Sequence, residues 1–256
     1  MQFDRFSHQI AEVIEGQAGG DALLAAVMAL FDCEAGFAVL NRSDGAPLYL
    51  ADSYPDPASK SAVQLYVQKT YLLNPVHGAI QAGVSSGVYR MADLAPDNWS
   101  ATTADVIADD AEEIHYRTPG WPQGLQEVCV LVALEGGVVG EVSLARTATV
   151  DGIPEEDMTD LKAALPLIHL AFQRLSQNSC ARQVNSNSAL ENFGQSVLTS
   201  REAEVVQMIL KGHSSLSISH ALTIALPTVK THRRNAYAKL GISTQQQLFR
   251  LFLEGE

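Results

Sequence analysis

Residues 226–242, LPTVKTHRRNAYAKLGI, carry the pattern that decides the fold of the C-terminal part of this chain. At 100° per residue, Ala236 and Leu240 each fall within about 20° of Val229, which predicts a helix over 226–240 with one apolar side. The apolar side is expected to pack against a core. The other side is therefore available for a different task.

The outward arc of this helix carries side chains suited to a DNA major groove. Counted from Val229, Arg234 lies at about 140°, Thr231 at about 200° and Lys230 at the margin near 100°. Lys and Arg can donate to guanine O6 and N7, and a threonine methyl group can contact thymine. We therefore predict that Lys230, Thr231 and Arg234 read base edges. The side chains predicted to contact DNA phosphates are Ser214, Thr228, His232, Arg233, Asn235 and Lys239.

Two shorter helices are predicted between residues 198 and 222. Thr199 or Ser200 can cap the first helix, Glu202 can complete a capping box, and Gly212 can end it. The second helix, over 215–222, is predicted to bury Leu216, Ile218 and Leu222. A turn at 223–225 then leads to the helix of 226–240, so three helices follow one another closely.

The strings LTSREAEVV (198–206) and TVKTHRRNAYAKLGI (228–242), with Gly212 between them, resemble the LuxR/GerE family of helix-turn-helix regulators. The basic residues alone are better explained as a solvated surface, and it is the resemblance that favours DNA binding. It covers about residues 198–254 and implies an all-α domain of four helices. This chain departs from the usual family sequence at two places. Ala225 stands where a serine cap is usual, and Ser217-Ile218-Ser219 stands where Glu-Ile-Ala is usual.

The resemblance also implies partners and contacts. It implies base contacts from the positions of Lys230, Thr231 and Arg234, with His232 beside the DNA backbone. A last helix, over 244–253, would supply a homodimer contact through Leu248, Leu251 and Phe252. The expected partner is double-stranded DNA with an inverted-repeat operator, read by a dimer, and RNA polymerase is a further candidate.

Charge is divided unevenly along the chain. The formal net charge is −12, but residues 196–256 hold seven Lys or Arg and four Asp or Glu, a balance of +3. The preceding residues hold 10 basic and 25 acidic side chains, a balance of −15. Such asymmetry indicates two domains with different partners. Only the C-terminal part has the sign to approach phosphates.

Targeting signals and cysteine frameworks are not evident. Residues 1–16 lack a cationic stretch followed by an apolar one, so no signal peptide is expected. The longest apolar runs are far shorter than the ~20 residues that span a bilayer. Cys33, Cys129 and Cys180 match no disulfide or metal spacing. We expect a soluble cytoplasmic protein with no membrane partner.

The residues before the C-terminal domain alternate between helical and strand-like patterns. About five strands in antiparallel hairpins, with helices before, between and after, predict an α/β (α+β) domain whose sheet is flanked by helices on both faces. Predicted domains are 1–178, a polar linker at 179–195, and 196–256. The predicted helices are 3–15, 21–31, 58–73 (ended by Asn74-Pro75), 101–117 and about 154–175; the predicted strands are 36–42, 47–53, 87–91, 127–135 and 138–146.

Three kinds of sensor domain could precede a helix-turn-helix domain of this type. A phosphoacceptor receiver is excluded because the chain begins with helices and Asp109-Asp110 lies inside a helical stretch. Residues 65–80, LYVQKTYLLNPVHGAI, resemble the autoinducer-binding domains, which bind acyl-homoserine lactones. Asn74 replaces the usual acid, however, and Met91 stands where a tryptophan is expected. A lactone receptor is therefore the alternative, and a GAF-like sensor of an unidentified small molecule is preferred.

Candidate ligand-pocket residues are aromatic side chains with a polar tip and one amide, although each could equally be an ordinary core or surface residue. They are Tyr66, Tyr71, Asn74, Tyr89, Trp99 and Trp121. Glu112, Glu113 and His115 are better explained as an exposed acidic patch than as a metal site. We therefore expect neither a metal nor a cofactor.

The first domain could in principle be an enzyme, or it could serve only for dimer formation. An enzyme is not expected, because the chain has no Gly-rich phosphate loop, no G-x-S-x-G and no H-E-x-x-H. A constitutive DNA-binding protein whose first domain only dimerises remains an alternative to the ligand-responsive regulator. A response to small molecules would distinguish the two.

Overall fold

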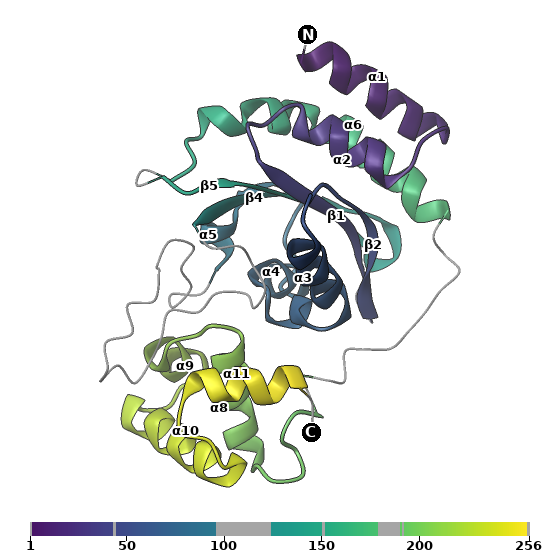
Figure 1. Cartoon of the computed structure of the whole chain (residues 1–256). Helices are drawn as coiled ribbons and strands as arrows, with labels where there is room; N and C mark the ends of the chain where they lie inside the picture. The colour runs from purple at the N-terminus through teal and green to yellow at the C-terminus, as the bar shows by residue number, and fades with distance from the viewer. Residues whose placement is uncertain are drawn as a thin grey trace.

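The computed structural model describes residues 2–42, 45–95, 124–149, 152–178, 190 and 192–254. The chain forms an N-terminal α/β domain and a smaller C-terminal domain made of helices (Figure 1). Among the described residues, no helix is long and apolar enough to cross a membrane.

A five-stranded antiparallel sheet forms the centre of the N-terminal domain. The strand order is β2-β1-β5-β4-β3, and every neighbouring pair is antiparallel. Both predicted hairpins are present, so the expected sheet is confirmed, and β5 is its central strand. The strands are β1 (Ala35–Arg42), β2 (Gly45–Asp52), β3 (Gly87–Arg90), β4 (Leu125–Ala133) and β5 (Val139–Thr147).

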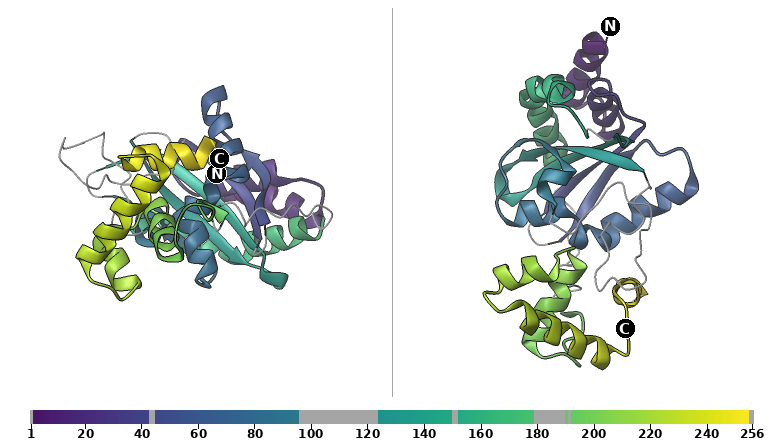
Figure 2. Two further views of the ribbon diagram at one scale, coloured as in Figure 1. Left: turned by 90° about the horizontal axis from the view of Figure 1, so that it is seen from below. Right: turned by 90° about the vertical axis from the view of Figure 1, so that its left-hand side faces the viewer.

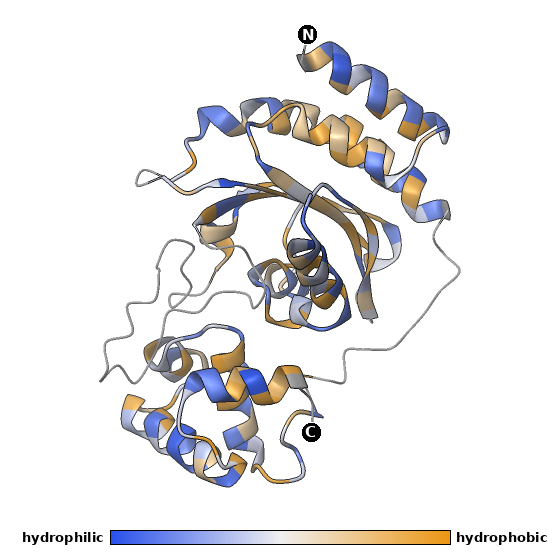
Figure 3. Cartoon of the chain, in the orientation of Figure 1, coloured by the Kyte–Doolittle hydropathy of each residue, from blue (hydrophilic) through white to orange (hydrophobic). Residues whose placement is uncertain are grey.

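Helices cover both faces of this sheet, as predicted (Figure 1). One face is covered by α1 (Gln2–Glu15), α2 (Gly20–Met28) and α6 (Thr159–Asn178). The opposite face is covered by α3 (Pro57–Gln68), the 3-10 turn η1 (Thr70–Leu73) and α4 (Pro75–Gln81), with the short α5 (Met91–Leu94) beside them. Figure 3 shows hydrophobic residues along the sheet and the helices packed on it. Each strand therefore sends side chains into two separate interiors.

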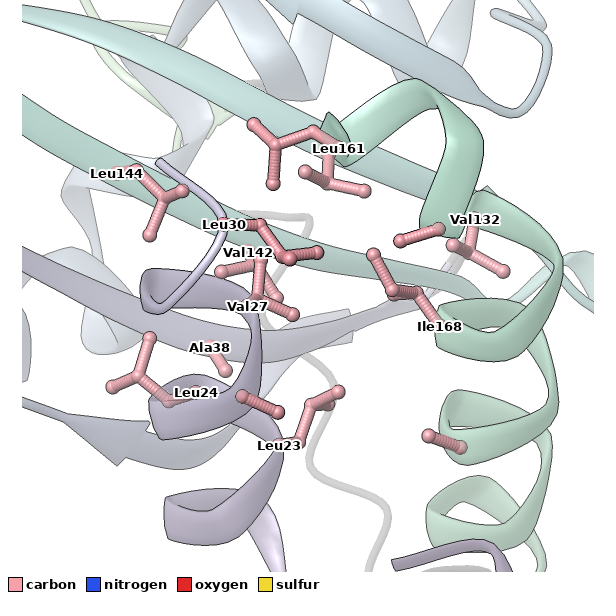
Figure 4. Close-up of a cluster of buried hydrophobic side chains, with 14 of the residues drawn as sticks. Leu23, Leu24, Val27, Leu30, Ala38, Val132, Val142, Leu144, Leu161 and Ile168 are labelled. Carbon is pink, nitrogen blue, oxygen red and sulfur yellow. The ribbon is translucent and has the colours of Figure 1, made fainter. Parts of the chain in front are cut away.

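The centre of the face beneath α1, α2 and α6 is a cluster of buried apolar side chains. Because successive side chains of a strand point to opposite faces, Ala38, Val142 and Leu144 lie on this side with Val27 of α2 and Ile168 of α6 (Figure 4). A Cβ atom at Gly140 would lie 2.4 Å from the ring of Phe172, so a glycine lets α6 approach the sheet closely. This side is a structural core.

Some predicted boundaries were wrong. Asn74-Pro75 does not only end a helix: Asn74 accepts a hydrogen bond from the backbone N–H of Val76, 2.8 Å away, and so begins α4. The predicted helix 58–73 is α3 followed by η1, and α6 begins at Thr159 after a 3-10 turn at Glu156–Met158. The predicted helix 101–117 lies outside the described residues.

The C-terminal domain has four helices, as predicted. They are α8 (Ser200–Leu210), α9 (Ser215–Ala221), α10 (Leu226–Leu240) and α11 (Gln245–Glu254). Thr199 and Glu202 form the predicted capping box, and Gly212 ends α8 with a φ of +86°. Leu216 was expected to be buried but is 54% exposed; Ile218 of the same helix is fully buried.

The two domains touch through η1, α4 and the C-terminal helices. One continuous cluster of buried apolar side chains includes Tyr66, Leu72 and Leu73 as well as Phe252. Figure 2 shows the helical domain on the side of the N-terminal domain that carries α3 and α4. Phe193, inside the predicted linker, is buried, and its ring centroid lies 5.4 Å from that of Phe252. The end of the predicted linker is therefore part of the helical domain's packing.

Candidate nucleic-acid interface and ligand site

The outward arc of α10 is exposed as the sequence predicts. Val229 and Ala236 are fully buried, whereas Lys230, Thr231 and Arg234 are exposed. In Figure 1, α10 lies at the edge of the helical domain away from the sheet. A basic helix with one buried side and one exposed arc has the arrangement that a helix entering a major groove requires.

Two of these side chains differ in how they are held. The Thr231 hydroxyl donates to the backbone carbonyl of Pro227 at 2.9 Å, which leaves its methyl group to face outward contacts. Within the described part of the chain, Arg234 has no hydrogen-bond partner or ion pair. A guanidinium without partners is free to donate to a base edge.

The predicted phosphate contacts fall into two groups. Thr228 and Asn235 are exposed and His232 is half-buried. Arg233 is half-buried and donates to the Ser215 hydroxyl at 3.3 Å. Ser214 caps α9 by accepting from the backbone N–H of Ser217 at 3.1 Å. Arg233 and Ser215 therefore join α10 to the start of α9, and the predicted phosphate contacts remain predictions.

Lys239 has a structural partner that the sequence did not reveal. Its Nζ lies 2.6 Å from the carboxylate of Glu202, the buried glutamate of the capping box. The Lys239 ammonium holds the pKa of Glu202 down at about 2, and the backbone N–H of Thr199 contributes in the same direction. Lys239 thus ties the end of α10 to the start of α8, and its predicted phosphate contact remains a prediction.

The predicted dimer residues on α11 are not equally accessible. Leu248 and Phe252 are 0% and 1% exposed within this single chain, and only Leu251 is half-buried. Leu248 and Phe252 are not available to a second copy in this arrangement. The dimer contact remains a prediction, and of the three residues Leu251 is the one placed to make it.

The four predicted ligand residues that the structure describes lie on the side of the sheet that carries α3 and α4, but not all have a free polar tip. Tyr66 and Tyr71 are buried there, and the Tyr71 ring packs edge-on against His77. The side-chain carbonyl of Asn74 caps α4 by accepting from the backbone N–H of Val76. The Tyr89 hydroxyl is hydrogen-bonded to the side chain and the backbone carbonyl of Ser85. Trp99 and Trp121 lie outside the described residues. Tyr66 is the predicted residue that leads to the polar centre of this face.

That centre is a buried glutamate on the central strand. Glu141 is fully buried and accepts hydrogen bonds from the side chains of Asn41 at 2.6 Å, Ser143 at 3.0 Å and Tyr66 at 3.3 Å. Burial raises the pKa of Glu141, and these three donors oppose the rise. The sheet thus carries a carboxyl group that is hydrogen-bonded but has no cation among its partners in the described chain.

A second buried glutamate lies on the neighbouring strand. Glu127 is 4% exposed, its Oε2 atom has no hydrogen-bond partner in the described chain, and both burial and the nearby Glu141 raise its pKa. The Tyr54 hydroxyl is also buried without a partner there; burial raises its pKa most, and Glu127 raises it further. We define the acidic cluster as Glu127, Glu141, Asn41, Ser143, Tyr54 and Tyr66.

The acidic cluster was missed although the sequence contained a signal for it. Both glutamates stand in apolar strand segments, EVCVLVALE and VVGEVSLAR. A sheet flanked by helices on both faces leaves no solvent-exposed side for such residues. A glutamate in a central strand should therefore be buried, and a buried carboxyl group without a cation is a candidate site. No group of three or more described His, Cys, Asp or Glu side chains could hold a metal ion.

The chain is similar to known proteins over different parts of its length. The VqsR LBD domain of Pseudomonas aeruginosa superposes with a TM-score of 0.48 and 16% identity, covering 68% of this chain and 95% of that one. SdiA of Escherichia coli superposes with a TM-score of 0.39 and 18% identity, covering 96% and 95%.

Sequence comparison gives two further relationships. Residues 196–252 match the family described as bacterial regulatory proteins, luxR family. The monoamine regulon transcriptional regulator of Klebsiella aerogenes is 30% identical over 186 residues, covering 70% of this chain and 75% of that protein. A relative from Aeromonas salmonicida, described as an HTH-type transcriptional regulator, is 27% identical over 195 residues, covering 70% and 93%.

Proposed function

The chain belongs to the luxR family of bacterial regulatory proteins and is a DNA-binding transcriptional regulator rather than an enzyme, and from this premise we propose that it reads an inverted-repeat operator as a dimer under the control of a small molecule. The helical domain would bind the DNA, and the acidic face of the N-terminal domain would bind the effector.

The arrangement of α10 is the observation that carries the DNA-binding part of the proposal. Lys230, Thr231 and Arg234 are exposed on one arc while Val229 and Ala236 hold the opposite side in the core. A guanidinium can donate two hydrogen bonds to guanine O6 and N7, and each such pair is worth about 1–3 kcal/mol of discrimination against another base. The helix can therefore supply sequence recognition as well as affinity.

The proposed dimer follows from the small reach of one recognition helix. A single helix contacts only a few base pairs, and two copies related by a two-fold axis read two half-sites about 34–36 Å apart. The net charge of +3 over residues 196–256 is modest, so a second copy would also add to the electrostatic attraction. Leu251 on α11 is half-buried and is the apolar side chain proposed to face the partner.

The effector part of the proposal is supported by the acidic cluster. Buried polar atoms are normally hydrogen-bonded, and those left without partners commonly mark a ligand or a functional group. Here Asn41 Oδ1, Glu127 Oε2 and the Tyr54 hydroxyl all lack partners in the described chain. A domain serving only to dimerise would gain stability from apolar residues at these positions.

Selection from a pool of random duplexes tests the DNA-binding proposal. The purified chain should enrich an inverted repeat with half-sites one helical turn apart. The triple substitution of Lys230, Thr231 and Arg234 by alanine should abolish this enrichment. Lys60→Ala is the matched control, because Lys60 is an exposed lysine of the N-terminal domain. Enrichment of one isolated half-site would contradict the dimer, and unchanged enrichment by the triple variant would contradict the assignment of α10.

A further inference from the structure

The end of α3 reaches two different parts of the molecule. Tyr66 is 4% exposed, and its hydroxyl donates to Glu141 Oε2 at 3.3 Å in the interior of the N-terminal domain. Lys69, three residues later, donates to the backbone carbonyl of Leu253 on α11. One helical turn thus joins the central strand of the sheet to the last helix of the C-terminal domain.

The inner end of this link is closely packed but weakly hydrogen-bonded. The ring of Tyr66 lies 5.0 Å from that of Phe37 on β1, inclined at 59°. Its hydroxyl lies 3.3 and 3.5 Å from the two carboxylate oxygens of Glu141. Both distances exceed the usual O–H···O range of about 2.5–3.0 Å. Asn41 at 2.6 Å and Ser143 at 3.0 Å are the closer donors. The bond from Tyr66 can therefore break without leaving the Glu141 carboxyl group unpaired.

The backbone between the two side chains is held in place. The backbone N–H of Lys69 donates to the carbonyl of Leu65 at 2.9 Å, which closes the last turn of α3. Lys69 itself has φ −150° and ψ −49°, outside the helical region, and there the chain turns into η1, whose four residues are all buried. Only one turn of helix separates Lys69 from Tyr66. A displacement of Tyr66 would therefore also displace Lys69.

The outer end of the link completes α11. The last carbonyls of an α-helix have no partners within the helix, and a lysine near that end can satisfy one of them and suits the helix dipole. Lys69 donates to Leu253 at 3.1 Å and lies 5.0 Å from the ring centroid of Phe252. Phe252 is buried and packs edge-on against Phe193. The N-terminal domain therefore supplies a cap for the last turn of α11.

We propose that Tyr66 and Lys69 are positioning residues that transmit the hydrogen-bonding state of Glu141 to α11. With Tyr66 bound to Glu141, Lys69 caps α11 and holds its last turn. When that bond is lost, the cap loosens and α11 opens more often. Leu251, the side chain proposed to face a second copy, lies on the turn that Lys69 holds. This inference goes beyond the proposed function, because it assigns a route within the chain and does not depend on the identity of the effector.

Amide hydrogen exchange of the full chain, measured by mass spectrometry without ligand or DNA, tests the link. Lys69→Ala should speed exchange in α11 about fivefold and Tyr66→Phe about twofold, because the long hydrogen bond of Tyr66 is the weaker contact. The double variant should exchange no faster than Lys69→Ala alone, since both substitutions act through the same cap. Tyr49→Phe is the matched control, because it removes a tyrosine hydroxyl that donates to Asp52 on the edge strand β2.

Exchange in α1 and α6 distinguishes the link from a general loss of stability. These helices cover the opposite face of the sheet, so Tyr66→Phe should leave their exchange at the wild-type rate. An equal acceleration in α1, α6 and α11 would overturn the proposal, and so would wild-type exchange in α11 of Tyr66→Phe. A double variant whose acceleration is the product of the two single effects would show two independent contacts and would overturn it as well. Duplex selection is a separate measurement, so failure of the link and failure of the DNA-binding proposal are distinguishable.

Discussion

Lys69, at the junction of α3 and η1, holds its ammonium 5.0 Å from the ring centroid of Phe252 on α11 and donates a hydrogen bond to the carbonyl of Leu253 at 3.1 Å. Burial lowers the pKa of Lys69. At the same contact between domains, Lys211 acts on His77 of α4, whose pKa burial lowers to about 4. The helices that cover the acidic cluster are thus the ones that touch the helical domain, so a ligand in the cluster has a short path to α11.

Removal of Lys69 should loosen α11. A cation–π contact of this kind contributes about 1 kcal/mol, so Lys69→Ala should speed amide hydrogen exchange across α11 roughly fivefold. Exchange in α8 and α10 should not change, because neither contact of Lys69 involves them. Lys60→Ala on α3 serves as the control. Equal exchange in α11 of the wild type and Lys69→Ala would show that the contact does not hold the helix.

Substitutions on α11 should separate folding from dimer formation. Phe252→Glu places a charge at a buried site and should reduce the free energy of unfolding by about 3 kcal/mol or more. Leu251→Glu, at a half-buried site, should cost less stability but weaken operator binding. Gln246→Glu adds the same charge at an exposed position of α11 and is the control. Circular dichroism melts and sedimentation equilibrium distinguish the outcomes; a fully dimeric Leu251→Glu protein would exclude Leu251 from the interface.

Arg234→Ala should reduce sequence specificity. A guanidinium that reads a guanine contributes mainly when that guanine is present, so the loss should be about 1–3 kcal/mol on the operator and small on random DNA. Fluorescence anisotropy with selected and scrambled duplexes measures both affinities. Equal losses on the two duplexes would identify Arg234 as a phosphate contact instead.

Lys239→Ala should affect both stability and DNA binding. Removal of the ammonium leaves the Glu202 carboxylate buried without its cation, so Tm should fall. If the proposed phosphate contact exists, affinity should fall alike on specific and random duplexes, and the salt slope should decrease by about one unit. The double variant Glu202→Gln/Lys239→Met should recover part of the lost Tm but not the salt slope. An unchanged Tm in Lys239→Ala would contradict the structural role of the ion pair.

The stability of the unliganded chain should fall as pH rises above the ordinary carboxyl range. Burial and mutual repulsion raise the pKa of Glu127, and burial raises that of Glu141, from 4.5 in an unperturbed glutamate. The folded chain therefore keeps protons that the unfolded chain releases. Their contribution is complete below pH 4.5 and is lost as pH rises through the folded-state pKa. In calorimetry, Glu127→Gln should flatten the decline of Tm, whereas Glu135→Gln should follow the wild type; parallel profiles for both variants would contradict the buried titration.

The four helices of the C-terminal domain could be predicted from the sequence because their signals are local. The apolar spacing of α10, the capping box at Thr199 and Glu202, and the glycine at 212 each act within a few residues. The hairpins of the sheet were predicted for the same reason, since a short turn between apolar runs sets its own register. The start of α4 was not predicted. Asn74-Pro75 was interpreted only as the end of the preceding helix, whereas the Asn74 side chain also caps the first turn of α4.

The sequence by itself determined the family, the order of the secondary structure and the exposed arc of α10, because these depend on neighbours along the chain. Only the tertiary structure decided what Glu127, Glu141, Lys239 and Phe252 do. The partners of these residues lie on other strands and helices. Lys69, which contacts Phe252, also donates to a carbonyl 184 residues away on α11. Burial and pairing arise when distant segments pack together, and a side chain's charge state and availability follow from that packing rather than from local spacing.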